Sequence, residues 1–151
     1  MREMGICGRF CRKKVRTTRV DPQARKAPNH LDRKFHVDAP NHVWAGDITA
    51  IRTRQGWLYL AVVMDLYSRQ VVGWAMEDAM EQELCLNALD MAVKRRRPPK
   101  QLLFHSDQGS QYTSNAYQRR LHECEIQGSM SHRGQCWDNA VVESFFWFAE
   151  T

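Results

Sequence analysis

Residues 43–76 read VWAGDITAIRTRQGWLYLAVVMDLYSRQVVGWAM, and the predicted fold is built around them. It is rich in β-branched and aromatic residues, which favour strands. A turn signal, TRQG, and a short corner, YSR, divide it into three strands at residues 43–52, 57–66 and 70–76. The middle strand is almost continuously apolar, as expected of a strand that is covered on both faces. We therefore predict an antiparallel meander of three strands.

A helical pattern follows the meander. Residues 81–97 carry apolar side chains at helical spacing, with acids at the start and the run Lys-Arg-Arg-Arg at the end, before Pro98 and Pro99. Acids at the N-terminus and cations at the C-terminus of a helix complement its dipole. For the basic run we therefore favour this structural explanation slightly over contact with DNA.

The remaining sequence alternates between strands and helices. We expect an α/β fold, in which a mixed five-stranded sheet has three antiparallel strands followed by alternating helices and strands, with the helices packed on it. The predicted elements are a strand at 102–105, a polar loop at 106–114, a helix at 115–124 with Ser114 as its cap, a strand at 126–130, a loop at 131–135 and a helix at 138–149.

Positive charge is concentrated in the first 36 residues. They hold 11 of the 22 Lys and Arg residues and 3 of the 17 acids, whereas residues 37–151 hold 11 cations and 14 acids. Prolines interrupt any helix there and, with the lack of an apolar face, argue against a transit peptide. We predict a basic arm or linker at residues 1–36 and a core domain at residues 37–151. The arm favours a polyanionic partner, with a solvated tail as the alternative.

Length and composition restrict the class of protein. A chain of 151 residues with 43% hydrophobic residues indicates one globular core and excludes full-length disorder, collagen and coiled coils. Because no apolar run resembles a membrane helix or a signal peptide, we expect a cytoplasmic protein without a membrane partner. The five scattered cysteines do not suggest a disulfide framework. A zinc site is a weak alternative, since its four ligands lack the usual spacing; they would be His122, Cys124, His132 and Cys136.

Three carboxylates occupy positions that packing does not explain. Asp47 lies inside the first strand, Asp107 follows the strand at 102–105, and Glu143 lies in an otherwise apolar helix. Each alone is more simply an acid paired with an arginine. Together they lie on elements that can meet at one edge of a mixed sheet. Their mutual repulsion then requires a compensating cation or protonation, and hard oxygen ligands suit Mg²⁺ or Mn²⁺.

Four sequence words surround these carboxylates: VWAGDIT at 43–49, VMDLYSR at 63–69, HSDQGSQY at 105–112 and CWDNAVVESFF at 136–146. In this order they resemble the catalytic core of bacterial DDE transposases of the insertion-sequence-three type, which are related to retroviral integrases and have a ribonuclease-H-like fold. The spacing of 35 residues between Asp107 and Glu143 is part of the resemblance, which covers residues 29–148.

The resemblance implies a function. Asp47, Asp107 and Glu143 would form the catalytic triad and hold two Mg²⁺ or Mn²⁺ ions, which assist in-line displacement at a phosphodiester. Water or a DNA 3′-hydroxyl would attack directly, giving cleavage and strand transfer at the ends of an insertion sequence. The implied partners are element-end DNA, target DNA and further copies of the chain in a synaptic complex, in the bacterial cytoplasm at the nucleoid.

Further residues receive supporting roles. Asn139 lies one helical turn before Glu143 and would orient its carboxylate. Asp65 is interpreted as support for a strand corner, and Asp138 as a helix cap. Loop rigidity is the alternative for the DNA-contact candidates outside the arm. The DNA-contact candidates are Arg12, Lys13, Lys14, Arg16, Gln111, Tyr112, His132 and Arg133.

The chain also departs from that family. It begins near the expected end of an upstream DNA-binding region and stops eight residues after Glu143, so we expect a core that is incomplete at its C-terminus. The alternative to an active transposase is therefore an inactive, truncated DNA-binding remnant or regulator of transposition. A general nuclease on the same fold is a third possibility.

Overall fold

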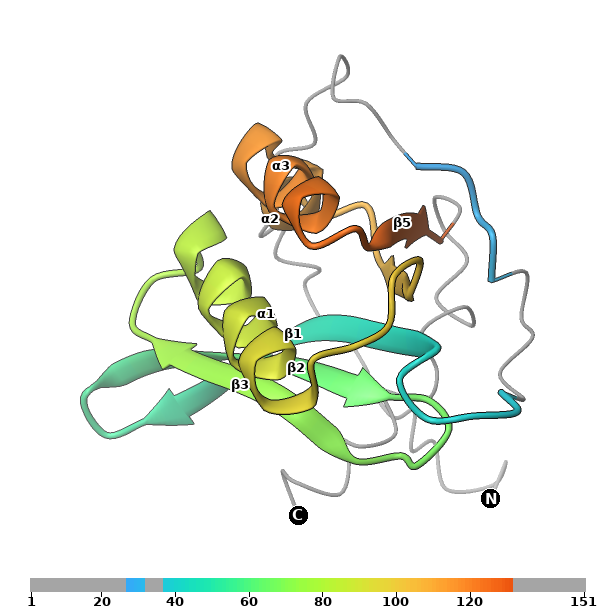
Figure 1. Ribbon diagram of the computed structural model, residues 1–151. Coiled ribbons are helices and arrows are strands. Elements are labelled where there is room, and N and C mark those ends of the chain that lie inside the picture. Colours follow the sequence, from blue (N-terminus) through green and yellow to red (C-terminus); the bar gives the residue numbers. More distant parts are fainter. Residues whose placement is uncertain (1–26, 32–36, 132–151) are drawn as a thin grey trace, which may run out of the picture.

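The computed structural model describes residues 27–31 and 37–131 (Figure 1). Five strands and three helices follow one another in this part of the chain. They are β1 (Val43–Thr53), β2 (Gly56–Asp65), β3 (Val71–Glu77), α1 (Gln82–Arg96), β4 (Leu103–Ser106), α2 (Ser110–Thr113), α3 (Asn115–Glu123) and β5 (Gln127–Met130).

The strands form one mixed sheet in the order β3-β2-β1-β4-β5. β1, β2 and β3 pair antiparallel, whereas β4 runs parallel to β1 and β5 runs parallel to β4. Gly56 closes the β1–β2 hairpin with a φ of 139°, which a residue with a side chain rarely adopts. The α/β fold with three antiparallel strands and a parallel extension is confirmed.

The helices cover one face of the sheet. Trp44, Ala61 and Phe104 point from the strands into a core that α1, α2 and α3 complete. α1 contributes Leu84, Cys85, Ala88, Leu89 and Ala92, all at most 2% exposed, and α3 contributes Tyr117 and Leu121. Because the strands are pleated, every second residue of β1, β2 and β4 faces away from α1.

Residues 27–31 lie against the edge strand β5. The backbone N–H groups of His30 and Leu31 donate to Ser129 Oγ, at 2.9 and 3.3 Å. Leu31 is 3% exposed and packs on the sheet face opposite α1, together with Ala45 and Val62. The segment covers an edge that would otherwise expose unpaired backbone groups. Part of the predicted arm thus packs on the core.

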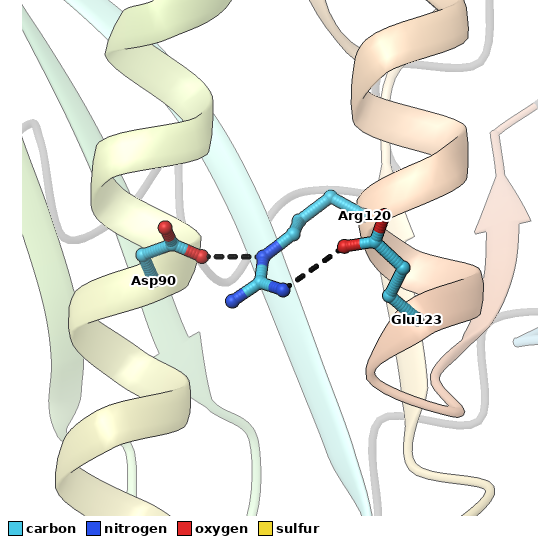
Figure 2. Close-up of polar contacts among 3 residues, drawn as sticks. All are labelled: Asp90, Arg120 and Glu123. Atoms are coloured by element: carbon cyan, nitrogen blue, oxygen red, sulfur yellow. Dashed lines mark hydrogen bonds and ion pairs between the residues drawn. The ribbon is translucent and has the colours of Figure 1, made fainter.

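An ion-pair network of three side chains joins α1 to α3 (Figure 2). Arg120 of α3 lies between Asp90 of α1, with a 2.7 Å contact from Nε to Oδ1, and Glu123, with a 3.1 Å contact from Nη1 to Oε2. The hydrogen bond to Asp90 is the main cause that raises the pKa of Arg120. Because these side chains are partly exposed, the network stabilises the fold only modestly.

Most predicted elements agree with the structure to within about one residue, but the polar loop at 106–114 does not. It contains the short helix α2, because Gly109 O accepts hydrogen bonds from the backbone and the hydroxyl of Thr113. Ser114 caps α3 as expected, by accepting from the Tyr117 N–H. The loop at 131–135 and the helix at 138–149 lie almost wholly outside the described residues.

The basic run at the end of α1 has a structural role. Lys94, Arg95 and Arg96 occupy the last turn, and Arg97 ends the helix in a left-handed conformation. Arg96 Nη2 donates to Gln70 Oε1 at 2.7 Å, which ties this end of α1 to the start of β3. These contacts support the structural explanation for the run.

Asp65 holds the corner between β2 and β3. It is fully buried, and its carboxylate accepts from Asn41 N–H at 3.0 Å and from the N–H and hydroxyl of Ser68 at 3.1 and 2.7 Å. These bonds join the turn before β1 to the corner after β2. The interpretation of Asp65 as corner support agrees with this geometry.

Asp65→Asn is expected to lower the free energy of unfolding by about 2 kcal/mol, because the amide places a donor against a buried N–H or hydroxyl donor. Urea denaturation measures the change. Asp38→Asn, at an exposed acid, is the matched control. Equal denaturation midpoints for the two variants would contradict the role assigned to Asp65.

Candidate active site

Asp47 and Asp107 come from neighbouring parallel strands. β1 pairs with β4 as Val43 with Leu103 and Ala45 with His105. Extending this register by two residues brings Asp107, just beyond β4, level with Asp47. Parallel strands lie about 4.8 Å apart, and paired residues point to the same face. Continued in this way, the register would set two of the three predicted catalytic carboxylates next to each other.

The loop after β4 holds Asp107 in place. The Gly109 N–H donates to Asp107 Oδ1 at 2.9 Å. Gln108 Nε2 donates to Ser131 O at 2.9 Å, and the Ser131 N–H donates to Ser106 O at 3.0 Å. These bonds join the loop to the end of β5. The backbone therefore orients the Asp107 carboxylate through its Oδ1 atom.

The surroundings of Asp107 favour its neutral form. Its side chain reaches solvent, yet the neighbouring protein still removes enough water to raise its pKa, and the Gly109 hydrogen bond opposes that rise. The single hydrogen bond from Gly109 therefore does not fully offset the loss of water around the negative charge of Asp107. A bound cation would favour the ionised form.

A tightly packed aromatic layer lies on the α1 side of the sheet, next to β1 and β4. Rings of Phe104 and Tyr112 lie 6.3 Å apart, and those of Tyr112 and Tyr117 5.3 Å apart, edge to face. A Cβ atom on Gly46 would lie 2.5 Å from Phe104 Cζ. Only glycine therefore fits at position 46, the neighbour of Asp47 that faces α1.

Both carboxylates are close enough to act on the same two buried groups. Burial is the main cause that raises the pKa of Cys85 to about 12 and the pKa of Tyr112 well above its ordinary value. The charges of Asp47 and Asp107 both add to these rises, and a hydrogen bond with Tyr112 lowers the pKa of Cys85. This shared influence agrees with the register.

Two DNA-contact candidates lie inside the protein. Gln111 is 7% exposed and its amide donates to Met80 O at 3.0 Å, which ties α2 to the segment before α1. Tyr112 is 3% exposed and packs in the aromatic layer. Buried side chains offer no surface to a duplex. The structure therefore favours the alternative, loop rigidity, for both residues.

Other predicted residues fall outside the described part of the chain. Within residues 27–31 and 37–131, no three acidic, histidine or cysteine side chains gather as a metal site. Of the zinc alternative, only His122 and Cys124 are described; His122 is exposed and Cys124 is half-buried. The predicted residues that lie outside are Arg12, Lys13, Lys14, Arg16, His132, Arg133, Cys136, Asp138, Asn139 and Glu143.

Gly46 and Gly109 are site residues that the sequence pattern alone did not single out. Gly46 allows the close approach of Phe104, and Gly109 supplies an N–H to Asp107. The available signal was their position, because each lies within two residues of a candidate carboxylate and glycine inside a strand often marks a close approach.

Asp47 in β1 and Asp107 just beyond the neighbouring strand β4 would provide hard oxygen ligands. Such a set suits Mg²⁺ or Mn²⁺ better than zinc, which prefers nitrogen and sulfur ligands in structural sites.

No helix in the described ranges is long and apolar enough to cross a membrane.

Sequence comparisons identify relatives of the chain. The model of the integrase core domain family matches residues 37–136. The transposase InsF for insertion sequence IS3A of Escherichia coli K12 is 52% identical over 118 residues, which cover 78% of this chain and 41% of the relative. The transposase for insertion sequence element IS904 of Lactococcus lactis is 40% identical over 146 residues, covering 97% of this chain and 58% of the relative. The chain thus spans less than two thirds of each.

Solved structures share the fold. A chain of the simian T-cell lymphotropic virus intasome, in complex with the PP2A regulatory subunit B56 gamma, aligns with a TM-score of 0.69 at 21% identity and covers 86% of this chain and 45% of that chain. The HTLV-2 integrase catalytic core domain in complex with magnesium aligns with a TM-score of 0.60 at 22% identity. The alignment covers 72% of this chain and 66% of that chain. These matches confirm the ribonuclease-H-like fold.

Proposed function

The chain belongs to the integrase core domain family, and from this premise we propose that it is the catalytic core of an insertion-sequence transposase that cleaves DNA and transfers strands. The observation that supports the proposal is the β1–β4 register, which would set Asp47 level with Asp107 if it continued for two residues past its last pair. The similarity of the chain to the transposase InsF and to the transposase of IS904 supports DNA as the substrate.

We assign Asp47 and Asp107 as catalytic residues, with Glu143 as the third carboxylate. Glu143 lies outside the described residues, so its place in the site rests on the sequence pattern. Asn139 is proposed to orient Glu143. The basic arm, including Arg12, Lys13, Lys14 and Arg16, and the segment with His132 and Arg133 are proposed to contact DNA phosphates.

The carboxylate pair fits divalent cations. Asp47 and Asp107 would hold Mg²⁺ or Mn²⁺, and the HTLV-2 integrase core, which shares the fold, was solved with magnesium. Two such ions supply Lewis-acid stabilisation of the attacking and leaving oxygens of a phosphodiester. The protein keeps Asp107 oriented through the Gly109 N–H and keeps β1 seated against Phe104 through Gly46.

The proposed reaction is a direct displacement at phosphorus. The oxygen of water or of a DNA 3′-hydroxyl forms the new P–O bond and its proton passes to solvent. The bond to the leaving 3′-oxygen breaks, and that oxygen takes up a proton from solvent. No protein side chain is covalently attached during the step. We further propose that copies of the chain assemble on two DNA ends; the HTLV-2 integrase core, which shares the fold, was solved in a dimeric form.

A joining assay tests this function. The whole protein is incubated with a labelled oligonucleotide duplex and supercoiled plasmid, with Mg²⁺, with Mn²⁺ or with EDTA. We expect label to be covalently joined to plasmid only when a divalent cation is present. Nicking without joining would instead indicate a general nuclease, and joining in EDTA would overturn the assigned site. DNA binding without either reaction would indicate a non-catalytic DNA-binding protein.

A further inference from the structure

The tip of the β1–β2 hairpin extends beyond the rest of the sheet. β4 pairs with β1 only at residues 43–45, and the last residue of β3, Glu77, pairs with Tyr59. Among the described residues, the register from Ile51 with Leu58 to Thr53 with Gly56 therefore has no third strand beside it. Figure 1 shows this tip projecting away from β4 and β5. We call residues 51–58 the hairpin tip.

The tip is held in shape by its own turn. Thr53 Oγ1 donates to Gly56 O at 2.9 Å and accepts from the Gln55 N–H at 3.2 Å. With the unusual φ of Gly56, these bonds define one turn conformation. The side chains of the tip are thus presented by a preorganised support, which lowers the entropy lost on binding.

The chemistry of the tip suits a nucleic acid. Trp57 is 54% exposed and pairs across the strands with Arg52. Arg54 and Trp57 line a groove of about 440 Å³, together with one acid, Asp78. Within residues 27–31 and 37–131, no ion pair involves Arg52 or Arg54, and both are exposed. Two available guanidinium groups beside an exposed indole outweigh the single acid.

The tip is rigidly linked to the carboxylates. Asp47 and Arg52 lie on the same strand, five residues apart, which corresponds to about 17 Å along β1; because five is an odd number, their side chains leave opposite faces of the strand. That distance equals about five base-pair steps of B-form DNA. A duplex with its reacting phosphate at Asp47 therefore has phosphates at the distance of the tip, where Arg54 lies in the turn and, among the described residues, no third strand separates the two faces.

We propose that the hairpin tip is a second DNA-contact site, about five base pairs from the reacting phosphate, in which Arg52 and Arg54 bind backbone phosphates and Trp57 packs against a sugar or an unstacked base. The proposal rests on the proposed function, since it assumes that the carboxylates act on DNA. Arginine contacts to phosphate position a duplex, and aromatic side chains add stacking that tolerates any sequence.

Salt-dependent binding tests the arginines. Fluorescence anisotropy measures the affinity of the whole protein for a labelled duplex between about 50 and 200 mM salt. Loss of two phosphate contacts in Arg52→Gln/Arg54→Gln should reduce the slope of log affinity against log salt by about 1.8. The native protein should therefore lose about ten times more affinity than the variant over this range. The matched control, Lys94→Gln/Arg95→Gln, removes two exposed charges from the end of α1 and should change the slope by less than half as much.

Trp57 variants test the stacking contact. Trp57→Ala should weaken binding to the same duplex by at least about fivefold, whereas Trp57→Phe, which keeps an aromatic face, should retain most of the affinity. Because Trp57 is exposed, both variants should unfold at the temperature of the native protein. Equal affinities for Trp57→Ala and the native protein would overturn the role of the indole, and would do so even if the arginines bind phosphate.

The outcomes separate this inference from the proposed function. Plasmid joining with unchanged slopes in Arg52→Gln/Arg54→Gln would overturn the hairpin site and leave the transposase function standing. A reduced slope without joining by the native protein would support the hairpin site and reject the transposase function. A slope that falls equally in the Lys94→Gln/Arg95→Gln control would show only nonspecific attraction and would overturn the hairpin site.

Discussion

Asp107→Asn is expected to reduce DNA joining by about a thousandfold or more and to leave the fold intact. The amide keeps an oxygen that can accept from the Gly109 N–H, so the loop geometry survives. It removes the negative charge that a divalent cation requires, and loss of several kcal/mol of transition-state stabilisation corresponds to three or more orders of magnitude in rate. The rate of label transfer into plasmid measures the effect.

Although Asp107→Asn should join DNA more slowly, its fold should be at least as stable as that of the native protein. Burial raises the pKa of Asp107, so the folded state binds its proton more tightly than the unfolded state does. The ionised carboxylate therefore costs stability above the folded pKa, and this cost disappears as pH falls below the ordinary value for aspartate. Without added cation, Asp107→Asn should melt at or above the native temperature at neutral pH, with a difference that shrinks in acid.

The control for this prediction is Asp38→Asn, which removes an exposed acid elsewhere. It should join DNA at the native rate. If Asp107→Asn retains joining at a rate similar to that of Asp38→Asn, Asp107 does not act in catalysis. If it loses both joining and cooperative unfolding, the loss reflects misfolding, and the role of Asp107 as a site residue rather than a structural one is wrong.

The local pattern of residues along the sequence was sufficient to predict most of the fold. The strands and α1 follow from hydrophobic periodicity and from turn residues, and Ser114 was identified as a cap because its hydroxyl precedes a helical pattern. The helix α2 could not be predicted, because residues 110–113 are too few to show a period. Its stability depends on contacts made in the folded protein, such as Gln111 with Met80.

The site was predicted from residue types, but its geometry required the register. Nothing local to Asp47 or Asp107 specifies that β1 and β4 pair in parallel, with Ala45 opposite His105. For the same reason Gln111 and Tyr112 were good candidates by position yet are buried, since their orientation depends on packing against Met80 and Phe104. The hairpin tip likewise could not be predicted, because nothing in its own sequence specifies that β3 and β4 end before it.

Close contact between α1 and β3 depends on a single glycine. A Cβ atom on Gly73 would lie 2.2 Å from Ala88 O, 2.7 Å from Ala92 N and 2.8 Å from Ala92 Cβ. Ala88 and Ala92 are themselves small and at most 1% exposed, so both elements approach with little between them. Two of the three contacted atoms belong to the α1 backbone, which cannot move aside as a flexible side chain can. A methyl group here must displace the helix as a whole.

Gly73→Ala is therefore expected to lower the free energy of unfolding by at least about 3 kcal/mol, at the upper end for an overpacked core. This is a large part of the roughly 5–15 kcal/mol typical of a domain. Urea denaturation measures the loss. The matched control is Gly128→Ala, whose Cβ would meet its nearest neighbour at an ordinary 3.6 Å and should change stability by less than about 1 kcal/mol. Because α1 is joined to the loop of Asp107 through Met80 and Gln111, any folded Gly73→Ala protein should also join DNA more slowly than Gly128→Ala. Similar denaturation midpoints for the two variants would show that α1 does not pack against β3 as closely as the structure has it.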